Sequence, residues 1–162
     1  MTLTAKRASD SATEMVQVVL PNDANPLGFI LGGTVMHLID IAGAIACHRH
    51  TRGLLVTAAV DGLQFLHPIK VGDLIILKSR VTCTFQTSLE VRVEVFSEEL
   101  LTGNRRLTSH AYLTFVAIDK NGQGVPVPPL WLETDEERRV ADEAQVRRAE
   151  RLKKRVTKDA SA

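Results

Sequence analysis

The 162-residue sequence has few cysteines, almost no net charge and no long apolar run, and each absence excludes a class of protein. Its two cysteines, Cys47 and Cys83, have neither metal-ligand spacing nor the partners of a disulfide framework. We therefore expect buried, reduced thiols and a cytoplasmic setting. A formal net charge of +1 gives no general reason to expect a nucleic acid partner. Because no apolar run approaches the ~20 residues of a membrane-spanning helix, we expect no membrane span.

The usual patterns of metal, serine and cysteine chemistry are missing as well. No serine stands in a nucleophile-elbow pattern, and nothing in the sequence favours Cys47 as a nucleophile. The N-terminal segment MTLTAKRASDSATE lacks the apolar core of a secretory signal, so export is not expected. We expect no metal site, and surface or helix-end positions for four histidines: His37, His48, His50 and His67.

Hydrophobic periodicity predicts one long helix and five strands. The helix spans residues 33–50, and the strands span 15–20, 54–60, 73–85, 89–95 and 107–118. In segment 89–95 aliphatic residues at odd positions alternate with charged residues at even ones, which is typical of a sheet with one face in water. An early apolar helix followed by strands joined by short turns predicts an α+β fold, in which an antiparallel sheet of five to six strands wraps the helix.

The chain is long enough for one compact core and too short for two ordinary domains. We expect a disordered N-terminal tail (1–11), one domain (12–130), and a charged C-terminal helix and tail (131–162). Thr134 and Glu137 form a capping-box pattern that predicts a helix start. The residues that follow are mostly charged, so a solvated, loosely packed helix is the simpler interpretation; a patch for phosphate groups or RNA is the alternative.

Residues 22–42, NDANPLGFILGGTVMHLIDIA, are the most informative part of the chain. A Gly-Gly pair opens the apolar helix, and Asp40 lies outside its apolar stripe, about two turns below Gly33. Unpaired N–H groups at the helix start can hold an oxygen that is becoming negative, while Asp40 activates a water molecule. This combination predicts acyl transfer to water.

Structural interpretations of the same residues stay open. Asp40 can be a buried carboxylate that accepts hydrogen bonds from the backbone or from Thr34. Asn25 stands before a proline, as asparagines in turns often do, so it can serve only to form the loop. Direct attack by Asp40 on the carbonyl, through an anhydride, is a less favoured form of the catalytic interpretation.

Several segments in a fixed order resemble the acyl-CoA thioesterase branch of the hot-dog fold, the group that contains the brain-type cytosolic acyl-CoA hydrolase and its single-domain bacterial relatives. The resemblance covers residues 22–137. It is carried by DANPLGFILGGTVMHLID (23–40), AGAIACHRH (42–50), FLHPIKVGD (65–73), TFQTSLEVRVEV (84–95), LLTGNRRLTSHAYLTFVAID (100–119), VPVPPL (125–130) and ETDEERR (133–139).

The resemblance implies a hot-dog fold and hydrolysis of fatty acyl-CoA to free fatty acid and coenzyme A. It implies catalysis by an Asn in the loop before the helix and an Asp in the helix, which match Asn25 and Asp40. Water would be activated by Asp40, with the oxyanion held by the N–H of Gly33. Many relatives have His before the two glycines, where this chain has Leu31.

The resemblance also implies partners. Coenzyme A would bind as part of the substrate or product, with no other cofactor required, and we expect contacts from Gly32, Thr34, Thr87, Ser88, Arg105 and Arg106. Small residues on the second side of the helix, Gly33, Asp40, Ala44 and Cys47, predict close approach by another chain, hence at least a dimer with the site at the seam. The resemblance implies a homohexamer, built as a trimer of dimers.

Two other functions remain as alternatives. A hot-dog protein can bind acyl-CoA without turnover, as a sensor or scaffold, although the pairing of Asn25 with Asp40 favours an enzyme. Hydration of enoyl-CoA by a related fold would bring an Asp-His pair in the loop and helix start, and none lies between Asn25 and Thr34.

Overall fold

The computed structural model describes residues 2–161, and one five-stranded antiparallel sheet with two long helices dominates it. The strands are β1 (Lys6–Arg7), β2 (Thr13–Val18), β3 (Leu54–Phe65), β4 (Leu74–Thr84), β5 (Ser88–Glu98), β6 (Arg105–Ile118) and β7 (Leu130–Trp131). The α-helices are α1 (Gly32–Thr51) and α2 (Asp135–Asp159), and short 3₁₀ turns span Ala8–Ser11 and Pro21–Asp23. Residues 1 and 162, the outer ends of the predicted tail and C-terminal segment, lie outside the described residues.

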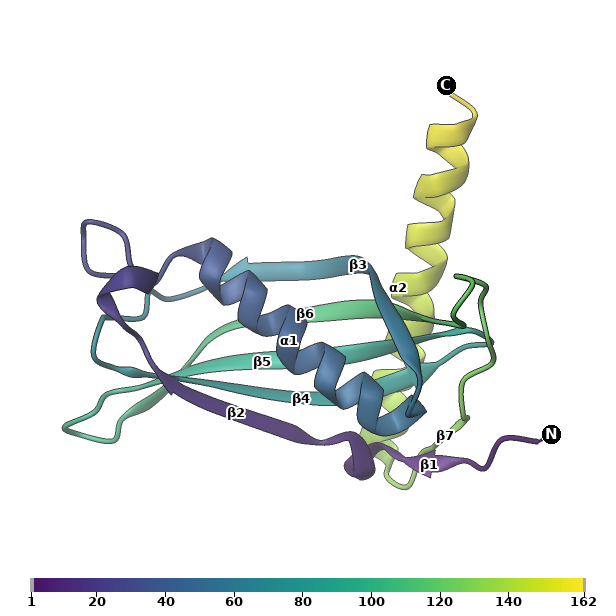
Figure 1. The fold of residues 1–162 in the computed structure, drawn as a ribbon, viewed down its shortest axis with the longest axis horizontal. Helices are drawn as coiled ribbons and strands as arrows, with labels where there is room; N and C mark the ends of the chain where they lie inside the picture. Colours follow the sequence, from purple (N-terminus) through teal and green to yellow (C-terminus); the bar gives the residue numbers. More distant parts are fainter. Residues whose placement is uncertain (1, 162) are drawn as a thin grey trace.

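Helix α1 lies along the concave face of the sheet, whose strand order is β2-β4-β5-β6-β3 (Figure 1). The apolar stripe predicted for this helix is buried at Val35, Leu38, Ile39, Ala42 and Ala46. It packs on aliphatic residues of β5, such as Val91 and Val93, and on Leu113 and Phe115 of β6. The expected central helix wrapped by an antiparallel sheet is therefore observed, with five strands.

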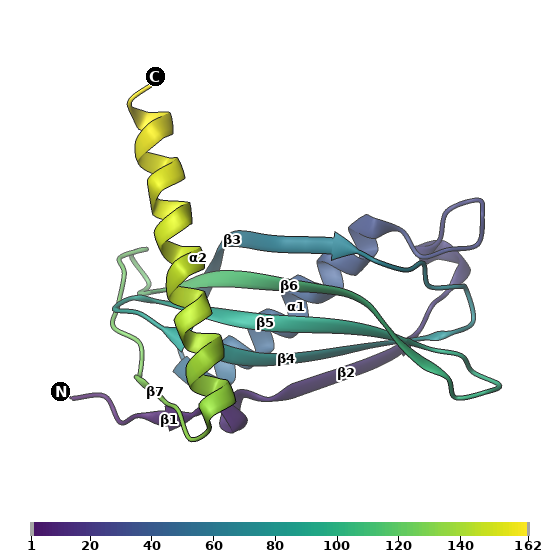
Figure 2. The ribbon, with the colours of Figure 1, turned by 180° about the vertical axis from the view of Figure 1, so that it is seen from behind.

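Helix α2 crosses the opposite, outer face of the sheet and extends beyond the edge strand β3 (Figure 2). Its start is capped as expected, because Thr134 Oγ1 accepts from the Glu137 backbone N–H at 3.1 Å and Glu137 Oε2 accepts from the Thr134 N–H at 3.3 Å. Val140, Ala141 and Ala144 are buried against the sheet. The prediction of a loosely packed helix is thus wrong for its first half.

The outer face of β5 differs from the prediction for the same reason. Glu90 was expected to face water, but α2 covers it and leaves it 1% exposed. Its carboxylate accepts two hydrogen bonds from the Arg147 guanidinium, at 2.8 and 3.0 Å, and one from the Thr82 hydroxyl at 2.7 Å. The alternating pattern correctly predicted the strand but could not show which element covers its polar side.

The N-terminal segment is ordered from Lys6 onward. β1 pairs in parallel with β7, Ala8 and Ser11 are buried, and the Ser11 hydroxyl accepts from the Val81 backbone N–H at 2.9 Å. The prediction of disorder over residues 1–11 is therefore wrong for residues 6–11. The short β1–β7 pair joins segments far apart in sequence, which periodicity cannot detect.

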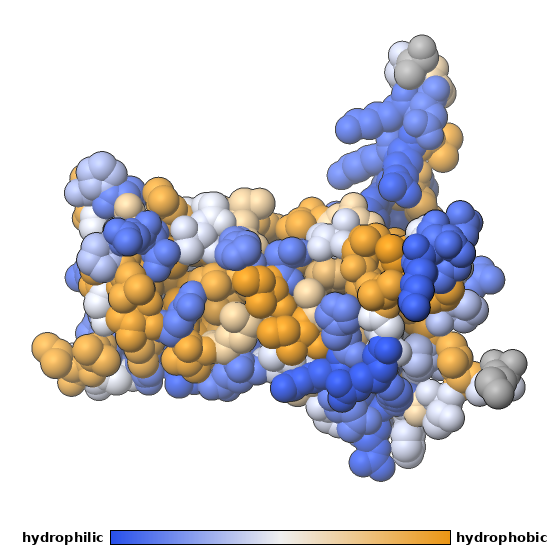
Figure 3. Space-filling view, viewed as in Figure 1, coloured by the Kyte–Doolittle hydropathy of each residue, from blue (hydrophilic) through white to orange (hydrophobic). Residues whose placement is uncertain are grey.

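Strand β3 forms one edge of the sheet and exposes apolar side chains. Leu54, Val56 and Val60 are each at least 44% exposed, and Leu31 and Met36 of the neighbouring helix region are similarly exposed. Apolar surface accordingly spreads over the face that carries α1 (Figure 3). Among the described residues, neither helix is long and apolar enough to cross a membrane.

Candidate active site

The start of α1 has backbone donors without helical acceptors. Leu31 is the N-cap residue and supplies no side-chain cap, and the first helical bond runs from the Val35 N–H to the Leu31 carbonyl at 3.1 Å. The preceding N–H groups, from Gly32 to Thr34, therefore lie at the positive end of a 20-residue helix. A Cβ atom added at Gly33 would meet nothing within 4 Å, so the space beside the Gly33 Cα is open within one chain.

Asn25 closes the loop that leads into α1. Its side-chain Oδ1 accepts from the backbone N–H groups of Leu27 and Phe29, at 3.0 and 3.1 Å. The loop-forming role considered for Asn25 is therefore real. Because backbone donors occupy Oδ1, the Nδ2 amide is the group that remains to donate to a ligand.

A cavity of about 350 Å³ connects this loop with the helix start. Asn25, Gly32 and Val35 contribute to its wall, and Phe65 at the end of β3 closes one side. The Phe65 ring lies 3.4 Å from the position that a Cβ atom of Gly32 would occupy. Glycine at position 32 thus allows the aromatic ring to approach the helix start.

Asp40 lies further along α1, beside the edge strand. Its carboxylate is half-buried, and Oδ1 accepts a hydrogen bond from the Thr57 hydroxyl of β3 at 2.7 Å. The alternative interpretation named the backbone or Thr34 as the donor to Asp40, whereas the structure has the Thr57 hydroxyl in that place. Thr57 is the residue that sequence analysis missed, since a lone threonine in a strand carries no signal until the helix and strand are aligned.

Within one chain, Asp40 and the helix-start cavity are separate. Seven residues between Gly33 and Asp40 correspond to about 10 Å along the helix axis, and Asp40 is not among the residues that line the cavity. The structure therefore brings Asn25 together with Gly32, and Asp40 together with Thr57, in two places along the same open edge.

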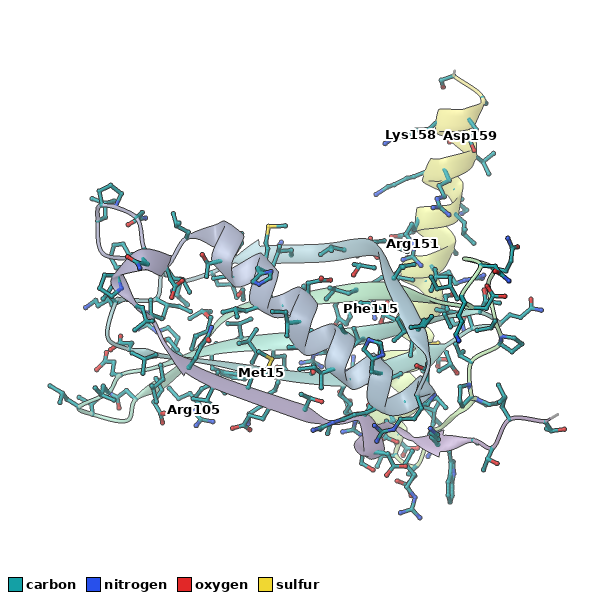
Figure 4. The ribbon with its side chains drawn as sticks, viewed as in Figure 1. Met15, Arg105, Phe115, Arg151, Lys158 and Asp159 are labelled. Atoms are coloured by element: carbon teal, nitrogen blue, oxygen red, sulfur yellow. The ribbon has the colours of Figure 1, made fainter. Side chains whose placement is uncertain are left out.

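The residues expected to contact coenzyme A also fall into two groups. Thr87 and Ser88 lie at the turn between β4 and β5, whereas Arg105 and Arg106 begin β6 opposite Glu98 and Ser97, at the other end of β5. Arg105 lies at the hairpin end of the sheet (Figure 4), and nearby Thr108 of β6 lines the helix-start cavity. A single chain therefore places the two arginines, but not Thr87 and Ser88, at the end of the sheet where α1 begins.

The two thiols and the His50 imidazole are buried, and none of them lines the helix-start cavity. Burial raises the pKa of the Cys47 thiol, and it raises that of Cys83 to about 11. Both cysteines are free and buried, as expected, and Cys47 belongs to the core of its own chain rather than to the side of α1 that was predicted to face another chain. His50 lies in the last turn of α1, which agrees with the predicted helix-end position, but it is buried: its Nε2 lies 2.8 Å from the Pro128 carbonyl oxygen, and burial lowers its pKa. Within residues 2–161, no three His, Cys, Asp or Glu residues are grouped to hold a metal ion.

Comparison with known proteins identifies the family. The thioesterase superfamily model matches residues 27–103. A Bacillus subtilis protein named an uncharacterized acyl-CoA thioester hydrolase is 44% identical over 119 residues, which are 74% of this chain and 69% of that protein. Human cytosolic acyl coenzyme A thioester hydrolase is 31% identical over 86% of this chain, but the chain spans only 37% of its length.

A solved structure resembles the whole chain. The acyl-CoA hydrolase from Bacillus cereus superposes with a TM-score of 0.90 at 34% identity, over 98% of this chain and 97% of that one. This similarity confirms the hot-dog fold that the sequence predicted. Together with the Bacillus subtilis relative, it shows that the chain belongs to the thioesterase superfamily, in the branch of the acyl-CoA thioester hydrolases.

Proposed function

We propose that the protein hydrolyses the thioester of fatty acyl-CoA, and that Asp40 activates the attacking water. The observation that carries the assignment is the Asp40 carboxylate, held by the Thr57 hydroxyl beside an open sheet edge and on the same helix as an uncapped N-terminus. A carboxylate fixed in this way has a free oxygen, Oδ2, with which to accept a proton from water.

The active unit is a dimer in which β3 pairs with β3 of a second copy. Support comes from the exposed apolar residues of this edge strand and from the separation of the two half-sites. An antiparallel pair about the middle of β3, between Ala59 and Val60, places Thr57 opposite Gly62 of the partner subunit. Phe65 of the partner subunit follows a few residues later and leads to its helix-start cavity.

Two-fold symmetry therefore unites the half-sites. Asp40 and Thr57 of one protomer meet Asn25 and Gly33 of the partner subunit, and the dimer contains two such sites. In each site Asn25 keeps Oδ1 for its own loop and uses Nδ2 to orient the water or the thioester carbonyl.

The reaction follows from these positions. Asp40 accepts a proton as the water oxygen attacks the thioester carbon, and the carbonyl oxygen becomes an anion that the Gly33 N–H stabilises, a contribution typically of about 3 kcal/mol. The tetrahedral intermediate then expels the coenzyme A thiolate, which takes up a proton. The products are the fatty acid and coenzyme A.

Solved relatives support the choice of residues and ligand. For a Staphylococcus aureus acyl-CoA hydrolase, at 31–32% identity, structures exist with butyryl coenzyme A and coenzyme A, and for alanine variants at an asparagine, an aspartate and a threonine. The three altered positions have the same spacing along that chain as Asn25, Asp40 and Thr57 have here.

The same relatives support further proposals. One acyl-CoA thioesterase with a TM-score of 0.89 is described as hexameric, so we propose a trimer of dimers here. Coenzyme A enters only as part of substrate or product, in contact with Gly32, Thr34, Arg105 and Arg106 of one protomer and Thr87 and Ser88 of the other, because the two-fold axis brings opposite sheet ends together. We propose a cytoplasmic location and a place in fatty acid metabolism, since the substrate is a soluble coenzyme A ester.

The test is release of free thiol from acyl-CoA esters from acetyl to palmitoyl, with coenzyme A binding measured by calorimetry on the same sample. We expect turnover of at least part of the series. Binding of coenzyme A without turnover of any ester would overturn the enzyme and leave the sensor or scaffold as the function.

A further inference from the structure

Beyond Arg151, the described part of α2 makes no hydrogen bond or ion pair with another element of its own chain. The helix is fixed to β5 by Arg147 and Glu90, and to the edge strand β3 by Arg151 and Asp61, whose Nη1 and Oδ2 atoms are 2.8 Å apart. Arg151 lies level with β3, whereas Lys158 and Asp159 lie well beyond the sheet (Figure 4). The helix therefore crosses the dimer edge at Arg151 and continues for about 12 Å up to Asp159.

An unpartnered apolar stripe begins at Ala149 and continues into this projecting part. Ala149, Leu152 and Val156 follow the i, i+3, i+7 spacing of one helix face. Leu152 is 40% exposed and Val156 is 70% exposed. A short, mostly basic helix segment without tertiary contacts is only marginally stable in water. Packing of the apolar stripe against another helix would stabilise it.

The direction of the stripe can be read from Gln145, which precedes Ala149 on the same face. Its Nε2 lies 3.5 Å from Cys83 Sγ, on the row of the sheet that runs from Cys83 through Glu90 to Thr114 and Ala59. The helix itself crosses β3 at Asp61, two residues further from Leu54 than Ala59 is. The apolar stripe therefore faces the Leu54 side of this crossing point, along β3.

The proposed dimer supplies a helix on that side. Pairing about the middle of β3 places Asp61 of the partner subunit opposite Ala58, so the second α2 crosses the seam three residues away, about 10 Å at 3.3 Å per residue. Packed helices lie 8–10 Å apart. Both α2 helices are on the outer face of the continuous sheet, and the two-fold axis makes them antiparallel.

We propose that the Ala149, Leu152 and Val156 stripe packs against the same stripe of a second copy, so that two α2 helices clamp the β3 seam. Along α2, the residue that comes next after the crossing of β3 at Arg151 is Leu152, so Leu152 lies where β3 meets β3 of the second copy and next to Leu152 of the partner subunit. Ala149 then packs against Val156 of the partner subunit. A small residue then faces a larger one on either side of the axis. Lys154 lies on the opposite side of the helix and stays in water.

Oxidative cross-linking of cysteine variants tests the contact, which rests on the β3 pairing proposed above. Leu152→Cys is oxidised with copper phenanthroline in the intact oligomer, with Lys154→Cys as the matched control on the opposite side of the same turn. A double variant, Ala149→Cys with Val156→Cys, detects the same helix contact if the two-fold axis passes beside Leu152 rather than through it. The native Cys47 and Cys83 are 0% and 5% exposed and provide the unreactive background.

We expect most Leu152→Cys or double-variant chains to run as covalent dimers on a non-reducing gel, at least fivefold more than Lys154→Cys. No excess over Lys154→Cys, in a sample that sedimentation shows to be dimeric or hexameric, would overturn the helix contact and leave β3 pairing and hydrolysis intact. A monomeric sample would overturn the contact and the β3 pairing together, while thiol release still reports hydrolysis separately.

Discussion

Recovery of activity on mixing two inactive variants tests whether each site draws residues from two subunits. The pair is Asp40→Asn, which keeps an acceptor for the Thr57 hydroxyl, and Asn25→Asp, which keeps an oxygen for the Leu27 and Phe29 N–H groups but loses the Nδ2 donor. Both changes preserve the local hydrogen bonds that the structure shows. We expect each variant alone to be folded, oligomeric and nearly inactive.

The expected recovery follows from the symmetry. If subunits associate at random after unfolding and refolding of an equimolar mixture, half of the dimers contain one chain of each kind. Each such dimer has one site with both defects and one site with none, so the mixture should regain about a quarter of the activity of the refolded parent.

The assay is thiol release from butyryl-CoA after refolding the parent, each variant and the mixture side by side. If both residues of a site came from one chain, every site would carry one defect, and the mixture would be no more active than the average of the two variants. That result, in a mixture shown by mass spectrometry to contain mixed dimers, would refute the reasoning.

Three further predictions concern stability. Gly43→Ala should destabilise the fold by about 1–3 kcal/mol, because its Cβ would lie 3.1 Å from Val91 Cγ1 and 3.3 Å from the Phe115 ring. Gly53→Ala, whose Cβ would meet nothing within 4 Å, is the control, and equal urea midpoints for the two variants would contradict the packing. Arg147→Leu should cost about 3 kcal/mol because it leaves the Glu90 charge buried, whereas Arg139→Leu, at an exposed ion pair, should leave the melting temperature unchanged. Burial lowers the pKa of His50, so below about pH 6.5 the unfolded chain binds a proton that the folded chain does not. The free energy of unfolding should therefore decrease as the pH is lowered, by up to about 1.4 kcal/mol per pH unit, until the pKa of the folded chain is reached. His50→Gln should flatten this part of the pH profile, and identical profiles for parent and variant would contradict the assignment.

Much of the fold could be predicted because local periodicity determines it. The apolar stripe of α1 gave bounds of 33–50 against the observed Gly32–Thr51, and the Thr134 capping box located the start of α2. Strands at 54–60 and 89–95 were correct in place but too short, since β3 continues through the irregular register near Asp61 to Phe65. The family resemblance, and with it the fold and the thioesterase assignment, was confirmed by the comparisons.

What could not be predicted depends on contacts between distant segments. The buried state of Glu90 requires knowing that α2 lies over β5, and the ordered state of residues 6–11 requires the pairing with β7. Thr57 becomes a candidate only when β3 lies beside Asp40. The roles of Asn25, Asp40 and Gly33 stay predictions, because a single chain holds them in two separate places.

The most direct test of the central claim is the turnover number of Asp40→Asn on saturating butyryl-CoA, measured with coenzyme A affinity and oligomeric state. If Asp40 activates the water, turnover should fall at least a hundredfold while coenzyme A affinity changes less than threefold and the oligomer persists. A variant that keeps more than a tenth of the parent turnover, with the same fold and assembly, would contradict a catalytic Asp40.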